Sequence, residues 1–191
     1  MSEEYTGVKY EAEKVGELSV SPTEQTKINQ LISLRDIYTE HNWLDRNGGN
    51  FSFRAERGFI IKTTGVWIEK VTDQDFARVT DVQGEKVFYE GNKLPSSECR
   101  THFYVYQKNP QVNFIFHAHV KEIASREDLT DKDFSIPEQP YGTMELAKEV
   151  SEKAKTMPFV IAINHGVFAF GDTFQNTLKI LLENYAQYRG A

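Results

Sequence analysis

Cysteine is almost absent from this sequence of 191 residues: Cys99 stands alone, which excludes an internal disulfide framework. No apolar run approaches the length of a bilayer-spanning helix, and the first residues lack the basic start and apolar stretch of a signal peptide. Positive charge is scarce as well, since 22 Lys and Arg stand against 28 Asp and Glu, a net charge of −6. We therefore expect a cytoplasmic protein whose main partner is neither nucleic acid nor a membrane.

The composition that remains is that of an ordinary globular protein. Apolar residues make up 39% of the chain and charged residues 26%, and the length fits one hydrophobic core. We predict a single domain over residues 1–191, in which residues 1–20 form an N-terminal extension that acts as an edge strand or an arm.

Local patterns predict one helix, then several strands, then helices and strands in alternation. Ser21, Pro22 and Glu24 make a capping box with proline at the first helical position, and helical apolar spacing continues to about Leu44. One helical turn is expected near 72–75. The expected strands are 51–55, 59–61, 79–81, 86–89, 112–117 and 159–163, and the further helices are 97–107, 144–155 and 174–188. This order favours an α/β sandwich with a mixed sheet and helices on its faces.

Three histidines follow apolar strands. His117 and His119 stand at positions i and i+2 of one strand, so both side chains point to the same face and can chelate one ion. A bare pair of this kind is more often an ordinary strand end. His165 ends a second apolar strand, although its Asn-His-Gly context is also a good turn. Three neutral imidazoles with an open position are typical of catalytic zinc. His41 and His102 lie within predicted helices, and we interpret them as structural or solvated.

Short hydrogen-bond donors occur in three further segments. Asn50 follows a glycine turn, Thr64 and Gly65 follow a strand, and Ser96 and Ser97 begin a helix whose N–H groups attract anions. Each segment alone is more often a turn or a cap. Together they can form a nest for a phosphate dianion without a basic patch.

Glu98 is the carboxylate that we single out. It lies in the predicted first turn of its helix, where the helix dipole stabilises negative charge. That stabilisation alone would explain a glutamate at this position. Next to the histidines, however, it can also serve as a fourth metal ligand or a proton-transfer group.

These segments, in this order, resemble the class II aldolase/adducin family, and the resemblance covers residues 23–188. The matching segments are Gly49-Asn50-Phe51-Ser52-Phe53-Arg54, Ile61-Lys62-Thr63-Thr64-Gly65, Leu94-Pro95-Ser96-Ser97-Glu98, His117-Ala118-His119 and Asn164-His165-Gly166. The resemblance implies a three-layer α/β/α sandwich with a central mixed, mostly antiparallel sheet. It also implies assembly as a homotetramer with sites near subunit interfaces.

The resemblance further implies roles for the candidate residues. Zinc, or another divalent transition metal, would be bound by His117, His119 and His165. Glu98 would be a ligand in the resting site and the catalytic acid/base once substrate displaces it. The residues that match phosphate-binding positions are Asn50, Thr64, Gly65, Ser96 and Ser97.

The implied reaction is cleavage of a phosphorylated sugar. A ketose 1-phosphate, such as fuculose or rhamnulose phosphate, would give dihydroxyacetone phosphate and an aldehyde through a metal-stabilised enediolate. An epimerase of ribulose 5-phosphate, a dehydratase of methylthioribulose 1-phosphate or a decarboxylase would use the same metal site. A non-catalytic adducin-like interaction module is a further alternative.

The resemblance weakens on the side where the aldehyde would leave. The stretch between His119 and Tyr141 is short and carries no tyrosine that could protonate an aldehyde oxygen. Tyr141 itself belongs to a Pro-Tyr-Gly turn, and we interpret it as a packing residue. The chain also ends at Ala191 without a tail to cover a neighbouring site. We therefore expect the metal-binding and phosphate-binding parts of the site to be intact, whereas the substrate or the reaction can differ from that of the aldolases.

Overall fold

One mixed sheet organises the computed structural model, which describes residues 6–44 and 48–190. Within these residues nine strands follow the order β1-β5-β4-β3-β2-β6-β9-β8-β7, and only the β1–β5 and β7–β8 pairs are parallel. The strands are β1 (Glu11–Gly16), β2 (Asn50–Arg54), β3 (Phe59–Lys62), β4 (Phe76–Gln83), β5 (Lys86–Glu90), β6 (Phe114–Ala118), β7 (Ser135–Ile136), β8 (Phe159–Ala162) and β9 (Gly166–Gly171). The predicted mixed, mostly antiparallel sheet is confirmed.

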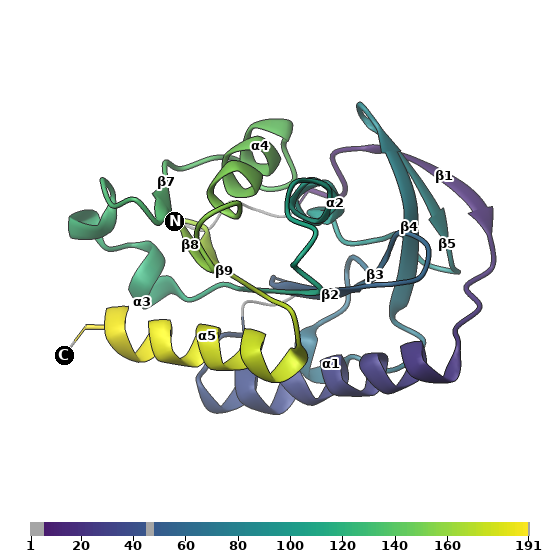
Figure 1. Cartoon of the computed structure of the whole chain (residues 1–191), viewed down its shortest axis with the longest axis horizontal. Coiled ribbons are helices and arrows are strands. Elements are labelled where there is room, and N and C mark those ends of the chain that lie inside the picture. The colour runs from purple at the N-terminus through teal and green to yellow at the C-terminus, as the bar shows by residue number, and fades with distance from the viewer. Residues whose placement is uncertain (1–5, 45–47, 191) are drawn as a thin grey trace.

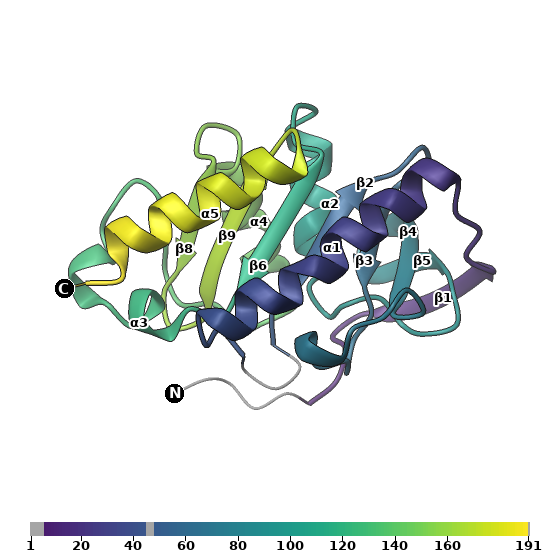
Figure 2. The ribbon, with the colours of Figure 1, turned by 90° about the horizontal axis from the view of Figure 1, so that it is seen from below.

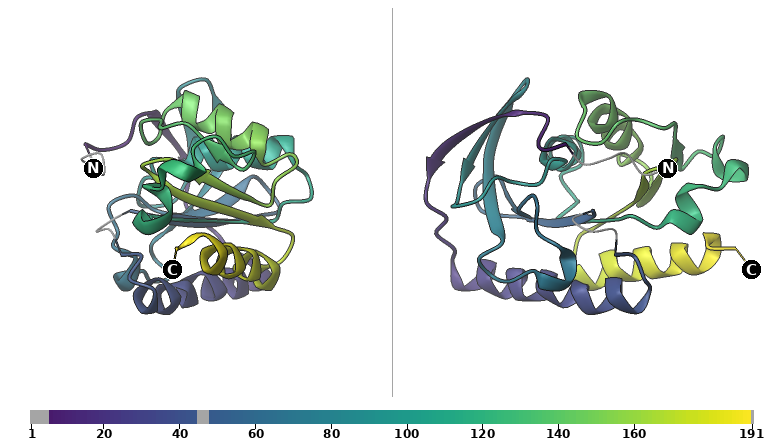
Figure 3. Two further views of the ribbon diagram at one scale, coloured as in Figure 1. Left: turned by 90° about the vertical axis from the view of Figure 1, so that its left-hand side faces the viewer. Right: turned by 180° about the vertical axis from the view of Figure 1, so that it is seen from behind.

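Helices cover both faces of this sheet and make three layers (Figure 1). The helices α1 (Pro22–Glu40) and α5 (Phe174–Tyr188) lie on one face, where Figure 2 shows both in front of the sheet. The helices α2 (Cys99–Lys108) and α4 (Met144–Lys153) lie on the other face, as both views of Figure 3 also show. Shorter turns are α3 (Lys121–Ala124), η1 (Ile68–Lys70) and η2 (Glu127–Leu129). No helix among the described residues is both long and apolar enough to cross a bilayer.

The start of α1 is fixed by local chemistry, as predicted. Ser21 Oγ accepts the N–H of Glu24, and the Glu24 carboxylate accepts the N–H of Ser21, so both arms of the capping box are present. The predicted end near Leu44 is wrong by four residues. Asn42 adopts a left-handed φ of 55°, which ends the helix at Glu40.

Two other local predictions need correction. No helical turn begins at Thr72: the Asp75 carboxylate instead accepts the N–H and O–H of Thr72 and closes a non-helical turn. The strand β9 was not predicted, because its Gly-Val-Phe-Ala-Phe-Gly run has no polar alternation. It pairs with β6 on one side and β8 on the other, and the sheet buries it completely. The expected edge strand in residues 1–20 is present as β1, which pairs with β5 alone.

Alternation along the central strands separates the two faces. Phe51 and Phe53 of β2 pack in the core cluster shared with α1 and α5. Asn50 and Ser52, which alternate with them, point to the α2 face. On β6, His117 lies directly opposite Asn50 and therefore points to the same face. The α2 face of the sheet is thus where the polar candidates gather.

Candidate metal centre

Four side chains converge at one end of the sheet. Ligand atoms of Glu98, His117, His119 and His165 all lie within 4.8 Å of one another. His117 is on β6, His119 directly follows β6, and His165 lies in the β8–β9 hairpin. The three imidazole centroids are 5.0 to 5.3 Å apart. The structure therefore brings together all four residues that the sequence predicted as ligands.

His117 is oriented by neighbours on both sides. Its Nδ1 lies 2.9 Å from the carbonyl oxygen of Val167, which can only accept, so Nδ1 carries the proton of the neutral ring. The hydroxyl of Tyr38, from α1, donates to the backbone carbonyl of His117 at 2.9 Å. The ring is stacked on Phe168 and fully buried. These contacts leave the Nε2 lone pair directed at the centre, as metal-binding histidines require.

The donor set fits a cation and fits poorly without one. Nε2 of His117 lies 3.0 Å from Oε2 of Glu98, and Nε2 of His165 lies 3.1 Å from Oε1. With His117 protonated on Nδ1, a nitrogen lone pair faces a carboxylate lone pair in a buried site, and these repel unless a positive charge lies between them. Three imidazole nitrogens and one carboxylate oxygen match the ligands of zinc, and other divalent transition metals accept the same set.

Glu98 is the buried carboxylate of the centre. It occupies the N-cap of α2, one position before the first helical turn in which the sequence placed it. Nδ2 of Asn50 donates to its Oε2 at 2.8 Å. Burial raises the pKa of Glu98, but its electrostatic and hydrogen-bond interactions with the adjacent His117 and His165 outweigh burial and hold the pKa well below its usual range. A bound cation acts in the same direction, so the carboxylate is ionised in the centre.

The comparison with known proteins decides the family. A model of the Class II Aldolase and Adducin N-terminal domain matches residues 29–187, most of the chain. The chain belongs to the class II aldolase and adducin family.

Two curated members of this family illustrate its range. The methylthioribulose-1-phosphate dehydratase of Pseudoalteromonas translucida is 35% identical over 94 residues, 49% of this chain and 43% of that protein. The L-fuculose phosphate aldolase of Escherichia coli is 32% identical over 136 residues, 63% of this chain and 61% of that protein. These matches span less than two thirds of either relative.

Solved structures of other proteins share the fold. YgbL from Klebsiella pneumoniae superposes with a TM-score of 0.75 at 19% identity, over 87% of this chain and 88% of that one. The L-fuculose-1-phosphate aldolase of Thermus thermophilus gives a TM-score of 0.62 at 17% identity, over 86% and 97%. The predicted class II aldolase-like architecture is therefore confirmed.

The segments predicted to bind the substrate phosphate lie next to each other. Thr64 N–H donates to Leu94 O at 3.0 Å, and Oγ1 of Thr64 lies 3.4 Å from Oγ of Ser97. Gly65 has a φ of +72°, which favours glycine, and the space beside its Cα is open. Ser96 N–H donates to the Lys62 carbonyl. Asn50 differs, because its amide group binds Glu98.

Lys62 is a residue of this region to which the sequence analysis gave no role. Its Nζ is fully buried and donates to the carbonyls of Val66, at 2.7 Å, and Thr63, at 3.3 Å. Burial lowers the pKa of Lys62 to about 8, against a smaller raising effect of Asp75. The available signal was a lysine at the end of the apolar run Phe-Ile-Ile on β3.

The other singled-out residues lie outside the ligand set. His41 is the C-cap of α1 and stacks on Trp43. His102 is fully buried, with Nδ1 2.7 Å from Oγ of Ser52, so it is structural rather than solvated. The Tyr141 hydroxyl donates to the carbonyl of Gly7, which confirms a packing role against the N-terminal segment.

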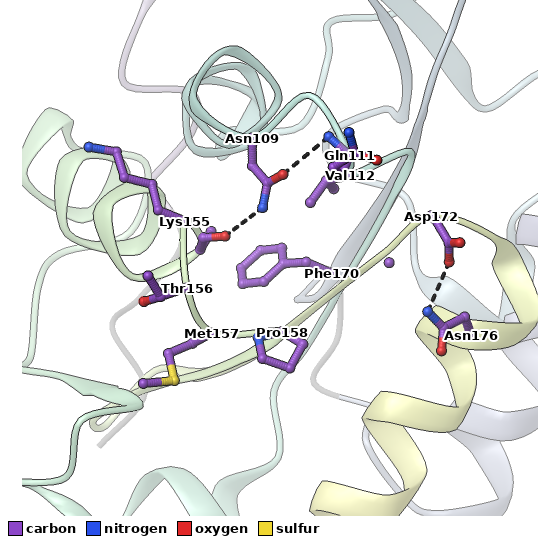
Figure 4. Close-up of a pocket in the computed structure, with 12 residues that line it drawn as sticks. Asn109, Gln111, Val112, Lys155, Thr156, Met157, Pro158, Phe170, Asp172 and Asn176 are labelled. Atoms are coloured by element: carbon purple, nitrogen blue, oxygen red, sulfur yellow. Dashed lines mark hydrogen bonds between the residues drawn. The ribbon is translucent and has the colours of Figure 1, made fainter.

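A hollow of about 350 Å³ lies at the opposite end of β6, β8 and β9 (Figure 4). Phe170 lines it, and two amides at its rim are already hydrogen-bonded: Asn109 donates to Ala154 O, and Asn176 donates to Asp172. None of the four candidate metal ligands lines this hollow, so the chemistry belongs to the other end of the sheet.

Proposed function

We propose that this chain is a zinc-dependent aldolase that cleaves a ketose 1-phosphate to dihydroxyacetone phosphate and an aldehyde. One observation carries the proposal: three imidazoles and a carboxylate meet within 4.8 Å in a member of the class II aldolase family. When bound, the divalent ion would supply Lewis-acid stabilisation of the negative charge that develops on the substrate.

The protein's own residues prepare this centre for an ion and a substrate. Val167 and Phe168 hold the His117 ring in one orientation, so ligation needs little rearrangement. His119 and His165 are only partly buried, whereas Glu98 and His117 are buried. The substrate would therefore approach from the side of His119 and His165.

Glu98 is the group that we propose to move the proton. An ionised carboxylate beside the reacting carbon can remove a proton in the direction of aldol addition and return it in the direction of cleavage. The Asn50 amide fixes one carboxylate oxygen at 2.8 Å, which limits the rotation of the side chain. This contact supports the proposed acid/base role of Glu98.

We propose that the phosphate of the substrate binds beside the start of α2. Thr64 and Ser97 supply two hydroxyls 3.4 Å apart, and the open backbone at Gly65 supplies room for an anion. Ser96 belongs to the same turn, and Asn50 would complete the set from the metal side. The ammonium group of Lys62 donates to the carbonyls of Thr63 and Val66 in this loop, which places a positive charge beside it.

A dehydratase reaction at the same centre is the second candidate. The 35% identity to a methylthioribulose-1-phosphate dehydratase favours it, as does the absence of tyrosine between residues 120 and 140. Epimerase and decarboxylase reactions would also use this centre. An adducin-like interaction module needs no ligand set, and the complete set in this chain argues against that alternative.

The test is a panel of ketose 1-phosphates incubated with the zinc-loaded protein and analysed by NMR. Dihydroxyacetone phosphate with an aldehyde identifies an aldolase, whereas loss of water with an intact carbon chain identifies a dehydratase. Glu98→Gln should lower kcat at least about 100-fold, and the exposed Glu149→Gln should leave it unchanged. If no panel member is turned over by the wild type, the proposal is wrong. The homotetramer and the cytoplasmic location remain predictions, and size measurement in the same preparation tests the former.

A further inference from the structure

Polar residues connect β2 to α2 in three steps. On the strand, Asn50, Ser52 and Arg54 are two residues apart, and on the helix, Glu98, His102 and Tyr106 are four apart. Two strand residues rise about 6.6 Å, and four helical residues rise about 6.0 Å. The two spacings agree closely enough for three successive residue pairs to make contact between the strand and the helix, and we call each pair a rung. We name these six residues the β2–α2 ladder.

Each rung is a contact in the structure. Asn50 Nδ2 donates to Glu98 Oε2 at 2.8 Å. Oγ of Ser52 lies 2.7 Å from His102 Nδ1 and 2.8 Å from the Tyr106 hydroxyl. Arg54, the third strand residue, donates to the Tyr106 carbonyl at 2.9 Å and lies over the Tyr106 ring. The ladder therefore runs unbroken from the metal centre along α2.

The middle rung is polar where packing alone would favour apolar residues. Ser52 and His102 are both completely buried, and Nε2 of His102 has no hydrogen-bond partner among the described residues. Such a group destabilises a fold. Burial lowers the pKa of His102 to about 3, so the ring is neutral and acts through hydrogen bonds. If packing were the only role of these two positions, apolar side chains would stabilise the fold more.

The middle rung also reaches the backbone of Glu98. The His102 N–H donates to the Glu98 carbonyl at 3.3 Å, so the His102 side chain and the Glu98 main chain belong to one turn of α2. Holding His102 against Ser52 holds this turn in register with β2. The same strand positions Asn50 against the Glu98 carboxylate.

We propose that Ser52 and His102 are positioning residues for Glu98, which they hold at the metal centre through the register of α2 on β2. This inference rests on the proposed function, because it assumes that Glu98 serves a bound divalent ion. It assigns no contact with substrate to either residue. Partners that orient metal ligands typically change metal affinity 10- to 100-fold when they are removed.

The test compares cobalt affinity and the visible cobalt spectrum of purified variants. Ser52→Ala should weaken cobalt binding about 10- to 100-fold and change the spectrum. Ser151→Ala, the matched control, removes another fully buried serine hydroxyl, which bonds only within α4, and should bind cobalt like the wild type. His102→Asn, which keeps a polar atom near the position of Nδ1, should retain more affinity than His102→Leu.

A double-mutant cycle separates positioning from a general loss of structure. In a Glu98→Gln background, Ser52→Ala should cause no further loss of cobalt affinity, because it acts through Glu98. An equal loss in both backgrounds, or wild-type binding by Ser52→Ala, overturns the inference alone. A wild-type protein that binds no cobalt overturns the proposed function, and the inference with it.

Discussion

The two faces of β2 and β6 differ sharply in chemistry although they belong to the same strands. Toward α1 and α5 they present Phe51, Phe53 and Phe116, all completely buried. Toward α2 they present Asn50 and His117, which lie opposite each other. One face thus supplies apolar burial and the other supplies ligands and their support. Because strand side chains alternate, neighbouring residues of one strand serve different purposes: one packs in the hydrophobic core and the next faces the candidate metal centre.

The comparison also shows why the polar face tolerates burial. Asn50 donates to Glu98, and His117 donates to Val167 O, so these donors are satisfied, while Nε2 of His117 and Oε1 of Glu98 keep lone pairs for the centre. The aromatic face needs no such matching, since its rings gain from contact area and edge-to-face packing. Substitutions on the two faces should therefore change different properties.

The largest expected effect on stability belongs to the aromatic face. Phe53→Ala removes a completely buried ring whose centroid is 6.2 Å from that of Phe114, and should lower the free energy of unfolding by about 3–5 kcal/mol. Urea denaturation measures this loss. Cobalt affinity, measured where the variant is folded, should stay within about threefold of wild type. A loss of affinity as large as that of Ser52→Ala would erase the distinction between the faces.

Lys62 provides a pH-dependent test on the aromatic face, where it lies opposite Phe76. Its folded pKa of about 8 lies below the ordinary value of 10.5, so between these pH values the unfolded chain binds more protons than the folded one. The free energy of unfolding should therefore rise as pH increases from 8 to 10.5, by roughly 3 kcal/mol relative to Lys62→Met. Urea titrations of both proteins across this range measure the difference. If the free energies of unfolding of the two proteins change with pH in parallel, burial does not lower the pKa of Lys62.

A smaller effect is expected where β9 approaches the centre. A Cβ on Gly166 would lie 2.5 Å from Ala118 O and 3.0 Å from Cε1 of His117. Gly166→Ala should therefore cost about 1–3 kcal/mol of stability and also weaken cobalt binding, because His117 must move. Gly16→Ala is the matched control, since its Cβ would make only ordinary contacts with Glu90. Equal cobalt affinity in both variants would show that His117 does not depend on this contact.

Local chemistry made several elements predictable. The capping box at Ser21 determined the start of α1, and the i, i+2 spacing of His117 and His119 placed both on one face. The ordered segments that resemble the family brought Glu98 and His165 into the same set. These predictions succeeded because each depends on residues close in sequence or on a motif that the family shares.

Contacts between distant residues were not predictable in this way. The hydrogen bond from Asn50 to Glu98 joins residues 48 positions apart and was not predicted. The pairing of Ser52 with His102 spans 50 residues, and neither position carries a local signal for it. Lys62 was missed because its burial depends on the fold of the loop that follows it. Such contacts depend on how α2 and the loops pack on the sheet, which sequence periodicity does not specify.

Metal content tests the central claim most directly. Elemental analysis after zinc reconstitution should find about one zinc per wild-type chain, none in His117→Ala, and the wild-type amount in His41→Ala, which removes a histidine outside the centre. That result would establish that the polar face of the sheet holds a metal ion. No zinc in the wild-type protein, or equal zinc in all three proteins, would contradict the account.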